Sequence, residues 1–196
     1  MRRHRTFRWA AVFGMAAAFA MAPAHAPLWA APPHPPIDRV LGALRLGMSV
    51  EQFQAAVPGD EQTGPENDLM PEERLFAVLR GGLPEGARGS GVRFLHGRLY
   101  RITADYREGT FDEARWKDLI GKNTERYGPP ISQNRNVGER VLEILQWDDP
   151  KTRLVIQREL RMRIENKKMV KKFTVLIMLL DRELWKERSE YEMSWY

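Results

Sequence analysis

Two helix starts divide this chain, and each is followed by segments with the two-residue period of β-strands. The first is a capping box of the S-x-x-Q type, in which Ser49 and Gln52 satisfy otherwise unpaired N–H groups of the first helical turn. Phe53 and Val57 lie on one side of the following turns, and Pro58-Gly59 stops the helix. We therefore expect a short amphipathic helix here.

The second helix start is a capping box of the T-x-x-E type at Thr110 and Glu113. Apolar residues at helical spacing follow it. They are Trp116, Leu119, Ile120 and Tyr127. Gly128 ends this helix at a position that favours left-handed backbone, and two prolines come next. The pattern predicts a second, longer amphipathic helix.

Strand-like segments follow both helices. The clearest is a hairpin over residues 92–106, with its turn at His96-Gly97. Four apolar residues on alternate positions of its second strand are expected to share one face of the sheet. They are Tyr100, Ile102, Ala104 and Tyr106. A short strand is also expected at residues 75–79, before a glycine-rich segment.

Further strands are predicted after the second helix, at residues 140–147 and 152–164. An alternative for the latter is a helix, because Ile156, Leu160 and Ile164 also have helical spacing. The unbroken apolar run at residues 173–180 predicts a strand buried on both faces, and a terminal helix is expected from Asp181 onward.

The order is therefore helix, strands, helix, strands, without the strand–helix–strand alternation of a parallel nucleotide-binding sheet. We predict the α+β class: an antiparallel sheet with the two main helices packed on one face, and an additional C-terminal helix. The two capped helices, each followed by strands, also hint at an internal repeat.

Residues 1–31 have the layout of a secretory signal peptide. Four arginines precede an apolar run, Trp9–Ala22, that is shorter than the roughly 20 residues of a membrane-spanning helix. Cleavage is expected after Ala26, or after Ala30 or Ala31. Residues 32–36 then form a proline-rich tether, and residues 37–196 a single domain. We expect a soluble periplasmic or secreted protein without a transmembrane segment, and without a lipid anchor because the chain has no cysteine.

Removal of the signal peptide changes the charge of the protein. The whole chain has 31 Lys and Arg against 26 Asp and Glu, a formal net charge of +5. Without the four N-terminal arginines, 27 bases remain against 26 acids. A nearly neutral protein has little general attraction for nucleic acid, so no nucleic-acid partner is expected. The absence of cysteine also excludes disulfides, so stability must come from the core.

Candidate catalytic and metal-binding residues are scarce. Of the four histidines only His96 lies in the predicted domain, and a lone histidine in a turn is usually solvated. Asp148-Asp149 fits a β-turn, and the acidic loop at residues 60–73 lacks the ligand spacing of a calcium site. We expect no metal and no cofactor, and the residues favour a binding protein over an enzyme. One alternative is a hydrolase that uses Asp105, Asp148 or Asp149 with a tyrosine, and another is a carrier with an apolar cavity between sheet and helices.

One segment, Lys151–Lys172, is strongly basic, with nine bases against Glu159 and Glu165. On a strand, Arg161 and Arg163 would project from the same face. Such a surface suits a protein partner or an anionic envelope component, although lysines on a sheet edge also serve to prevent aggregation. The residues that we assign to partner contact are Arg161, Arg163, Lys167, Lys168, Lys171 and Lys172.

The run Gly47-Met48-Ser49-Val50-Glu51-Gln52-Phe53 resembles the helix-opening motif of small outer-membrane assembly lipoproteins of the SmpA/OmlA (BamE-like) type. The same run also resembles β-lactamase inhibitor proteins, which have a related two-layer fold. Tyr127-Gly128-Pro129-Pro130 resembles the turn that ends helices in such domains. The resemblance implies an exported α+β domain that binds other macromolecules without catalysis, as an envelope accessory or an inhibitor-like module. No oligomeric state follows from the sequence.

Overall fold

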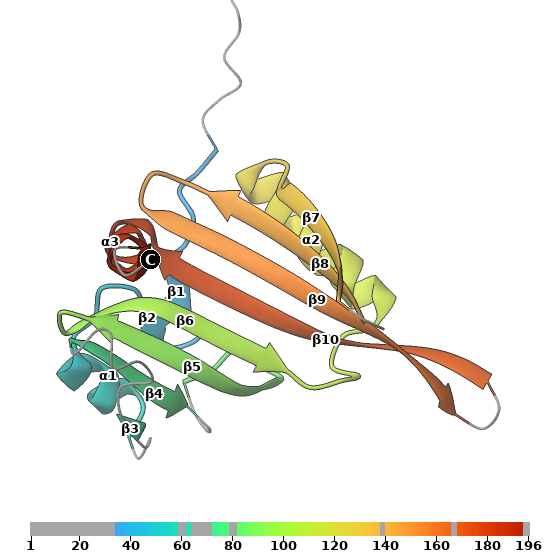
Figure 1. Cartoon of the computed structure of the whole chain (residues 1–196), viewed down its shortest axis with the longest axis horizontal. Coiled ribbons are helices and arrows are strands. Elements are labelled where there is room, and N and C mark those ends of the chain that lie inside the picture. The colour runs from blue at the N-terminus through green and yellow to red at the C-terminus, as the bar shows by residue number, and fades with distance from the viewer. Residues whose placement is uncertain are drawn as a thin grey trace, which may run out of the picture. The chain divides into compact units, whose positions relative to one another are not determined.

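An eight-stranded antiparallel sheet forms the centre of the fold (Figure 1). In the computed structural model of the chain, the described residues are 34–58, 62–63, 72–78, 82–137, 140–165 and 168–193. The predicted signal peptide and most of the acidic loop lie outside them. Ile37, directly after the predicted tether, is the first buried residue of the described part.

The strands of the large sheet form two consecutive groups of four. They are β3 (Gln62–Thr63), β4 (Glu73–Val78), β5 (Ala87–Leu95), β6 (Arg98–Tyr106), β7 (Ile131–Val137), β8 (Arg140–Asp148), β9 (Thr152–Glu165) and β10 (Lys168–Asp181). Their order across the sheet is β3-β4-β5-β6-β10-β9-β8-β7. Each group is thus an antiparallel meander, and the two meanders meet where β6 pairs with β10. A separate two-stranded sheet consists of β1 (Val40–Leu41) and β2 (Leu44–Arg45).

Three helices accompany the sheet, and the predicted α+β class is confirmed. They are α1 (Val50–Ala56), α2 (Glu113–Tyr127) and α3 (Arg182–Met193). Phe53 of α1 and Trp116 of α2 belong to one hydrophobic core, so both helices pack on the same face, which we call the helix face. Each half of the molecule is one helix followed by one meander, the arrangement that the repeated pattern hinted at. None of the helices in the described part is both long and apolar enough to cross a membrane.

The first helix is built as its sequence predicts. The backbone N–H of Gln52 donates to Ser49 Oγ at 3.3 Å, and the backbone N–H of Ser49 donates to the Gln52 side chain at 2.9 Å. This capping box aims Phe53 at the sheet, where its ring lies 5.1 Å from that of Phe76 and 5.5 Å from that of Phe94. The three rings are fully buried and form the core of the first half.

The second helix begins differently from the prediction. Its N-cap is Asp112, whose Oδ1 accepts a hydrogen bond from the backbone N–H of Arg115 at 2.7 Å. The predicted box with Thr110 as the cap was therefore wrong, because Asp112 offers a strong acceptor two residues closer to the helical turns. The predicted end is confirmed: Gly128 has a φ of 84° and caps the helix. Its carbonyl also accepts a hydrogen bond from the Trp147 indole at 2.8 Å.

A β-bulge in the β5–β6 hairpin places Tyr100 on the face opposite the helix face. The register shifts after Arg93, which leaves Tyr100 as the extra residue of β6. Tyr100 packs with Leu95 and with Leu184 of α3 in a second, smaller core, whereas Ile102 belongs to the main core. The expectation that Tyr100 and Ile102 share a face was therefore wrong, because a strict two-residue period does not allow for a bulge.

A buried charged network holds α3 on this second core. Glu73 is only 5% exposed, and its Oε1 accepts hydrogen bonds from the Tyr100 hydroxyl at 2.5 Å and from Arg93 at 3.1 Å. Arg188 of α3 lies with its Nε 3.6 Å from the other oxygen of Glu73. Burial, followed by the hydrogen bond with Glu73, raises the pKa of Tyr100. The Tyr100 hydroxyl therefore keeps its proton and remains a donor.

The segment after the tether is fixed to the turn before β9 and to the start of α3. The backbone N–H of Ile37 donates to Asp149 Oδ2 at 2.6 Å. Arg39 forms an ion pair with Asp181 at 2.5 Å and donates to Thr152 Oγ1 at 3.3 Å. Asp181 and Thr152 are both buried, so this segment closes one end of the sheet.

His96 occupies the predicted β5–β6 turn, but it is not a free solvated residue. It has a φ of 51°, and its ring lies between Glu72 and Glu187 of α3, with Nε2 2.5 Å from Glu187 Oε1. The hydrogen bond with Glu187, together with Glu72, raises the pKa of His96. In its charged form the imidazole therefore joins the turn to α3.

Replacing Phe53 with alanine should lower the free energy of unfolding by about 3–5 kcal/mol, because the cavity lies among fully buried rings. Urea unfolding of the full chain measures this difference. The control is Ile131→Ala on β7, where the side chain is 56% exposed and the change should stay within about 0.5 kcal/mol. Similar losses in the two variants would contradict this assignment of the core.

The His96→Asn variant should make stability less dependent on pH, since asparagine tolerates positive φ but carries no charge. Because the pKa of His96 is higher in the folded state, its charged form stabilises the fold. This contribution is complete below the pKa of the unfolded state, about 6.5, and it is lost as the pH rises through the pKa of the folded state. The variant should thus be less stable than the parent at about pH 5.5 and equal to it at about pH 9. Urea unfolding at both pH values checks this, with Lys186→Gln on α3 as the control. An equal difference in stability between the parent and His96→Asn at both pH values would contradict the ionic link between the turn and α3.

Candidate functional site

The predicted basic segment forms β9, the turn before it and the first residues of β10. β8 pairs with β9 only as far as Arg161, and β6 pairs with β10 only from Val175 onward. The outer residues of β9 and β10, 162–165 and 168–174, therefore project as a two-stranded arm (Figure 1). Lys167 lies outside the described residues, and so do the side chains of Arg163 and Lys168.

The described bases of this segment are mostly paired with acids. Arg161 Nε lies 2.6 Å from Glu159, and Lys172 Nζ lies 3.2 Å from Glu108. Lys171 is exposed on β10. The net charge counted along the sequence therefore overstates the positive charge that a partner would meet, because neighbouring strands and loops supply compensating carboxylates.

Arg158 is enclosed by two aromatic rings and two carboxylates. Its side chain is 18% exposed, and its guanidinium carbon lies 4.6 Å from the ring centre of Trp116 and 5.3 Å from that of Phe173. The same group forms ion pairs with Glu113 at 2.9 Å and with Glu143 at 2.6 Å. Arg158 thus fixes the start of α2 to β8, β9 and β10, which gives it a structural role.

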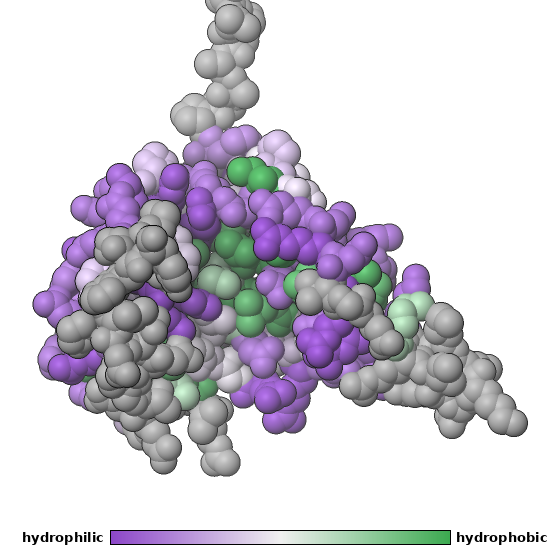
Figure 2. Space-filling view, in the orientation of Figure 1, coloured by the Kyte–Doolittle hydropathy of each residue, from purple (hydrophilic) through white to green (hydrophobic). Residues whose placement is uncertain are grey.

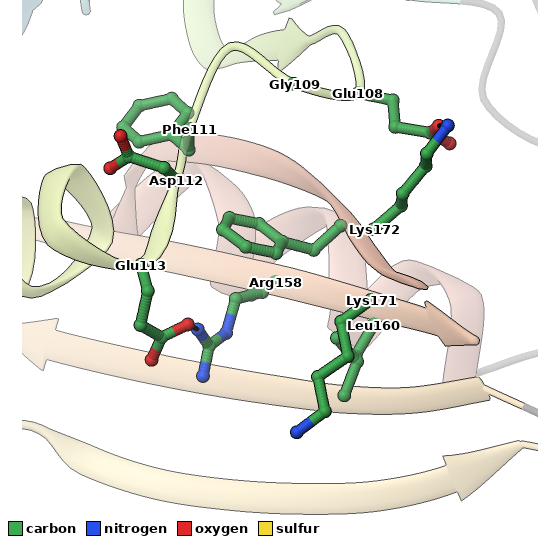
Figure 3. Close-up of a pocket in the computed structure, with 10 residues that line it drawn as sticks. Glu108, Gly109, Phe111, Asp112, Glu113, Arg158, Leu160, Lys171 and Lys172 are labelled. Atoms are coloured by element: carbon green, nitrogen blue, oxygen red, sulfur yellow. Dashed lines mark hydrogen bonds and ion pairs between the residues drawn. The ribbon is translucent and has the colours of Figure 1, made fainter. Parts of the chain in front are cut away.

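A pocket of about 660 Å³ lies beside Arg158, next to the N-terminus of α2 (Figure 3). Its apolar walls are Phe111, Leu160 and Phe173. Lys171 and Lys172 of β10 also line it, and Figure 3 shows the Lys172 side chain reaching across to the loop before α2. The basic segment predicted from the sequence thus lines this pocket in part, but the sequence reasoning missed the apolar walls.

Two exposed apolar side chains continue this region, one on β8 and one on the arm. Val141 lies opposite Leu160, which lies opposite Phe173, and Met162 lies opposite Lys171. Directly opposed residues of antiparallel strands share a face of the sheet. Val141 is 41% exposed and Met162 is 48% exposed. We call the pocket and these two residues the distal pocket.

The face opposite the helix face is covered at one end by α3, and we call its remainder the open face. Two neighbouring rows of β8, β9 and β10 cross its middle. They are Ile144–Gln157–Leu176 and Gln146–Val155–Met178. All six side chains are half-buried, and four of them are apolar. Figure 2 shows apolar surface in the middle of this face, surrounded by hydrophilic residues.

The apolar run at residues 173–180 forms a strand as predicted, but it is not buried on both faces. Val175, Ile177 and Leu179 lie in the main core, whereas Leu176 and Met178 are only half-buried. The prediction was wrong because the run was taken to imply cover on both sides. The unbroken apolar run was the sequence feature from which the open face could have been predicted.

The carboxylates of the hydrolase alternative do not converge on one pocket. Asp149 accepts hydrogen bonds from backbone N–H groups, and Asp105 lies on β6, separated from β8 by β10 and β9. Asp148 is paired with Arg153 at 2.8 Å. Burial alone would raise the pKa of Asp148, but hydrogen bonds from Arg153 and Gln146 outweigh it and lower the pKa. Within the described residues, no group of three or more histidine, aspartate or glutamate side chains is placed to hold a metal.

The carrier alternative requires an apolar cavity between sheet and helices, and a small one exists. It lies between α2, the sheet and the segment around β1, with Leu41, Leu119 and Ile177 among its walls. Its volume is about 250 Å³. Pockets for small molecules usually start at roughly 300 Å³, so this cavity does not favour a carrier.

None of the protein-family models, curated proteins or solved structures compared with this chain matches it. The resemblance to the SmpA/OmlA-type and β-lactamase-inhibitor domains therefore stays a prediction from two short motifs.

The enclosed position of Arg158 predicts that Arg158→Met lowers the free energy of unfolding by about 2 kcal/mol. The variant removes the cation–π contacts and leaves Glu143 without its partner. The matched control, Arg161→Met, removes an ion pair that is more exposed and should change stability by about 0.5 kcal/mol or less. Urea unfolding measures both variants, and equal effects would contradict the structural role of Arg158.

Proposed function

We propose that this chain is an exported, non-catalytic binding protein that holds a protein partner on the open face of its sheet. The observation that carries the proposal is the apolar centre of this face. A sheet face with apolar side chains is normally buried against another layer, and within the described part of the chain α3 supplies that layer only at one end. Exposed apolar patches with polar rims mark protein contact sites.

The composition of the open face favours a protein partner. Its centre, Ile144, Val155, Leu176 and Met178, is apolar and uncharged, while glutamines lie in the same rows. Interfaces between proteins have this anatomy, with few charges in the middle and polar groups at the rim.

The predicted contact residues lie at the edge of this surface. Lys172 is in register with Arg161, so both belong to the open face at the base of the arm. Both are paired with acids, and each pair is partly exposed. Charges in such positions contribute more to the rate of association and to partner choice than to affinity. We therefore assign Arg161 and Lys172 to the rim of the interface, and the apolar centre to its affinity.

The signal-like residues 1–31 support an exported protein, and the two resembling motifs support a role in envelope assembly or as an inhibitor. The scattered carboxylates of the hydrolase alternative support binding without catalysis. Together these features favour a partner that is itself a protein outside the cytoplasm.

Site-specific photo-crosslinking tests the proposal. A photoreactive phenylalanine analogue at Met178 should give a discrete crosslinked partner in cell-envelope extracts, because this side chain would lie in the interface. The control position is Glu125, which is exposed on α2 and lies on the other side of the molecule. No crosslink at position 178, or the same crosslinks at both positions, would refute the proposal.

A substitution in the same chain gives an independent measure. Leu176→Lys should reduce the crosslink at position 178 by about tenfold or more, because a charge would be buried in the interface. The half-buried position should keep the loss of stability within about 1 kcal/mol, which urea unfolding verifies.

A further inference from the structure

A second surface of this molecule, which adjoins the open face at Lys172, is the free edge of the arm. β10 pairs with β9 along Lys168–Asp181, but with β6 only from Val175 to Leu180. Among the described strands, the segment Lys168–Thr174 thus has a neighbour on one side only. Among the described residues, no backbone hydrogen bond joins its other side to another segment. A strand edge of this kind offers a row of N–H and C=O groups to an incoming strand.

The distal pocket lies directly beside this edge. Phe173 is part of both, since it lies on the edge segment and lines the pocket with Phe111 and Leu160. Because side chains alternate along a strand, a strand added to this edge would point every second side chain toward the pocket. The backbone edge and the apolar pocket can therefore be used by the same ligand.

We propose that the arm binds an extended peptide segment as an additional antiparallel strand on β10, with an apolar side chain in the distal pocket followed by two acidic residues. In this register the apolar residue lies opposite Phe173. The next two residues lie opposite Lys172 and Lys171, which favour carboxylates. Strand addition of this kind takes affinity from backbone hydrogen bonds and specificity from pockets for alternate side chains.

The ion pair between Glu108 and Lys172 lies across the entrance to this edge. The two atoms are 3.2 Å apart, and the side chains are 31% and 29% exposed. Exposed ion pairs of this kind are weak, so an acidic residue of the incoming strand can take the place of Glu108. The pair thus makes Glu108 a competitor of the ligand.

Fluorescence anisotropy with dye-labelled synthetic peptides tests the proposal on the full chain. The probe is Thr-Val-Thr-Leu-Glu-Asp-Thr with blocked ends, and a second probe carries lysines in place of its two acids. A third probe has an N-methylated leucine, which removes one backbone donor. The first probe should bind saturably, and each altered probe about tenfold or more weakly.

Variants of the chain separate strand addition from general charge attraction. Lys172→Gln should weaken binding of the first probe about threefold to fivefold, and Glu108→Gln should strengthen it by a similar factor. Lys151→Gln, an exposed lysine in the β8–β9 turn, should leave binding unchanged. A gain in Glu108→Gln is not expected from a variant that merely unfolds.

Absence of binding by the first probe, equal binding of the N-methylated probe, or no gain in Glu108→Gln would each overturn the strand-addition proposal. These outcomes do not depend on the crosslink at Met178, which probes the open face. The two proposals can therefore fail separately.

Discussion

The pairing of β6 with β10 makes one molecule out of two similar halves. It extends over six residue pairs and joins the last strands of the two meanders. It also brings Ile177 and Leu179 of β10 beside Ala104 and Ile102 of β6, so the cores under α1 and α2 are continuous. Without this pairing each half would be a single helix on a four-stranded sheet with an exposed edge, which is a poor basis for stability.

The two surfaces that no described helix covers follow from the different lengths of strands and helices. A strand of 14 residues such as β9 or β10 extends over roughly 46–48 Å, whereas the 15 residues of α2 extend over about 22 Å. One helix of this length cannot cover such strands from end to end, which leaves the distal pocket beyond its N-terminus. On the other face, α3 has 12 residues and packs on the bulged end of the β5–β6 hairpin, which leaves the open face.

Local motifs were predictable from the sequence, and arrangements that depend on distant contacts were not. The Ser49 capping box, the hairpin turn and Gly128 are set by a few neighbouring residues, and all three are confirmed. The position of β10 beside β6, and the face to which Tyr100 turns, depend on a register between segments far apart in the chain. The candidate site was predictable in part: the basic segment marks the arm, but pairs such as Lys172 with Glu108 form only in the folded chain.

The position of β10 also limits the order in which the chain can acquire its structure. β10 is the last strand along the sequence, yet it lies in the middle of the sheet, between β6 and β9. Until residues 168–181 are available, the first meander ends in an unpaired β6, and the second lacks its fourth strand. The complete sheet therefore cannot form before the C-terminal quarter of the chain has been synthesised. Such a delay leaves the two halves without their shared core until the chain is nearly whole.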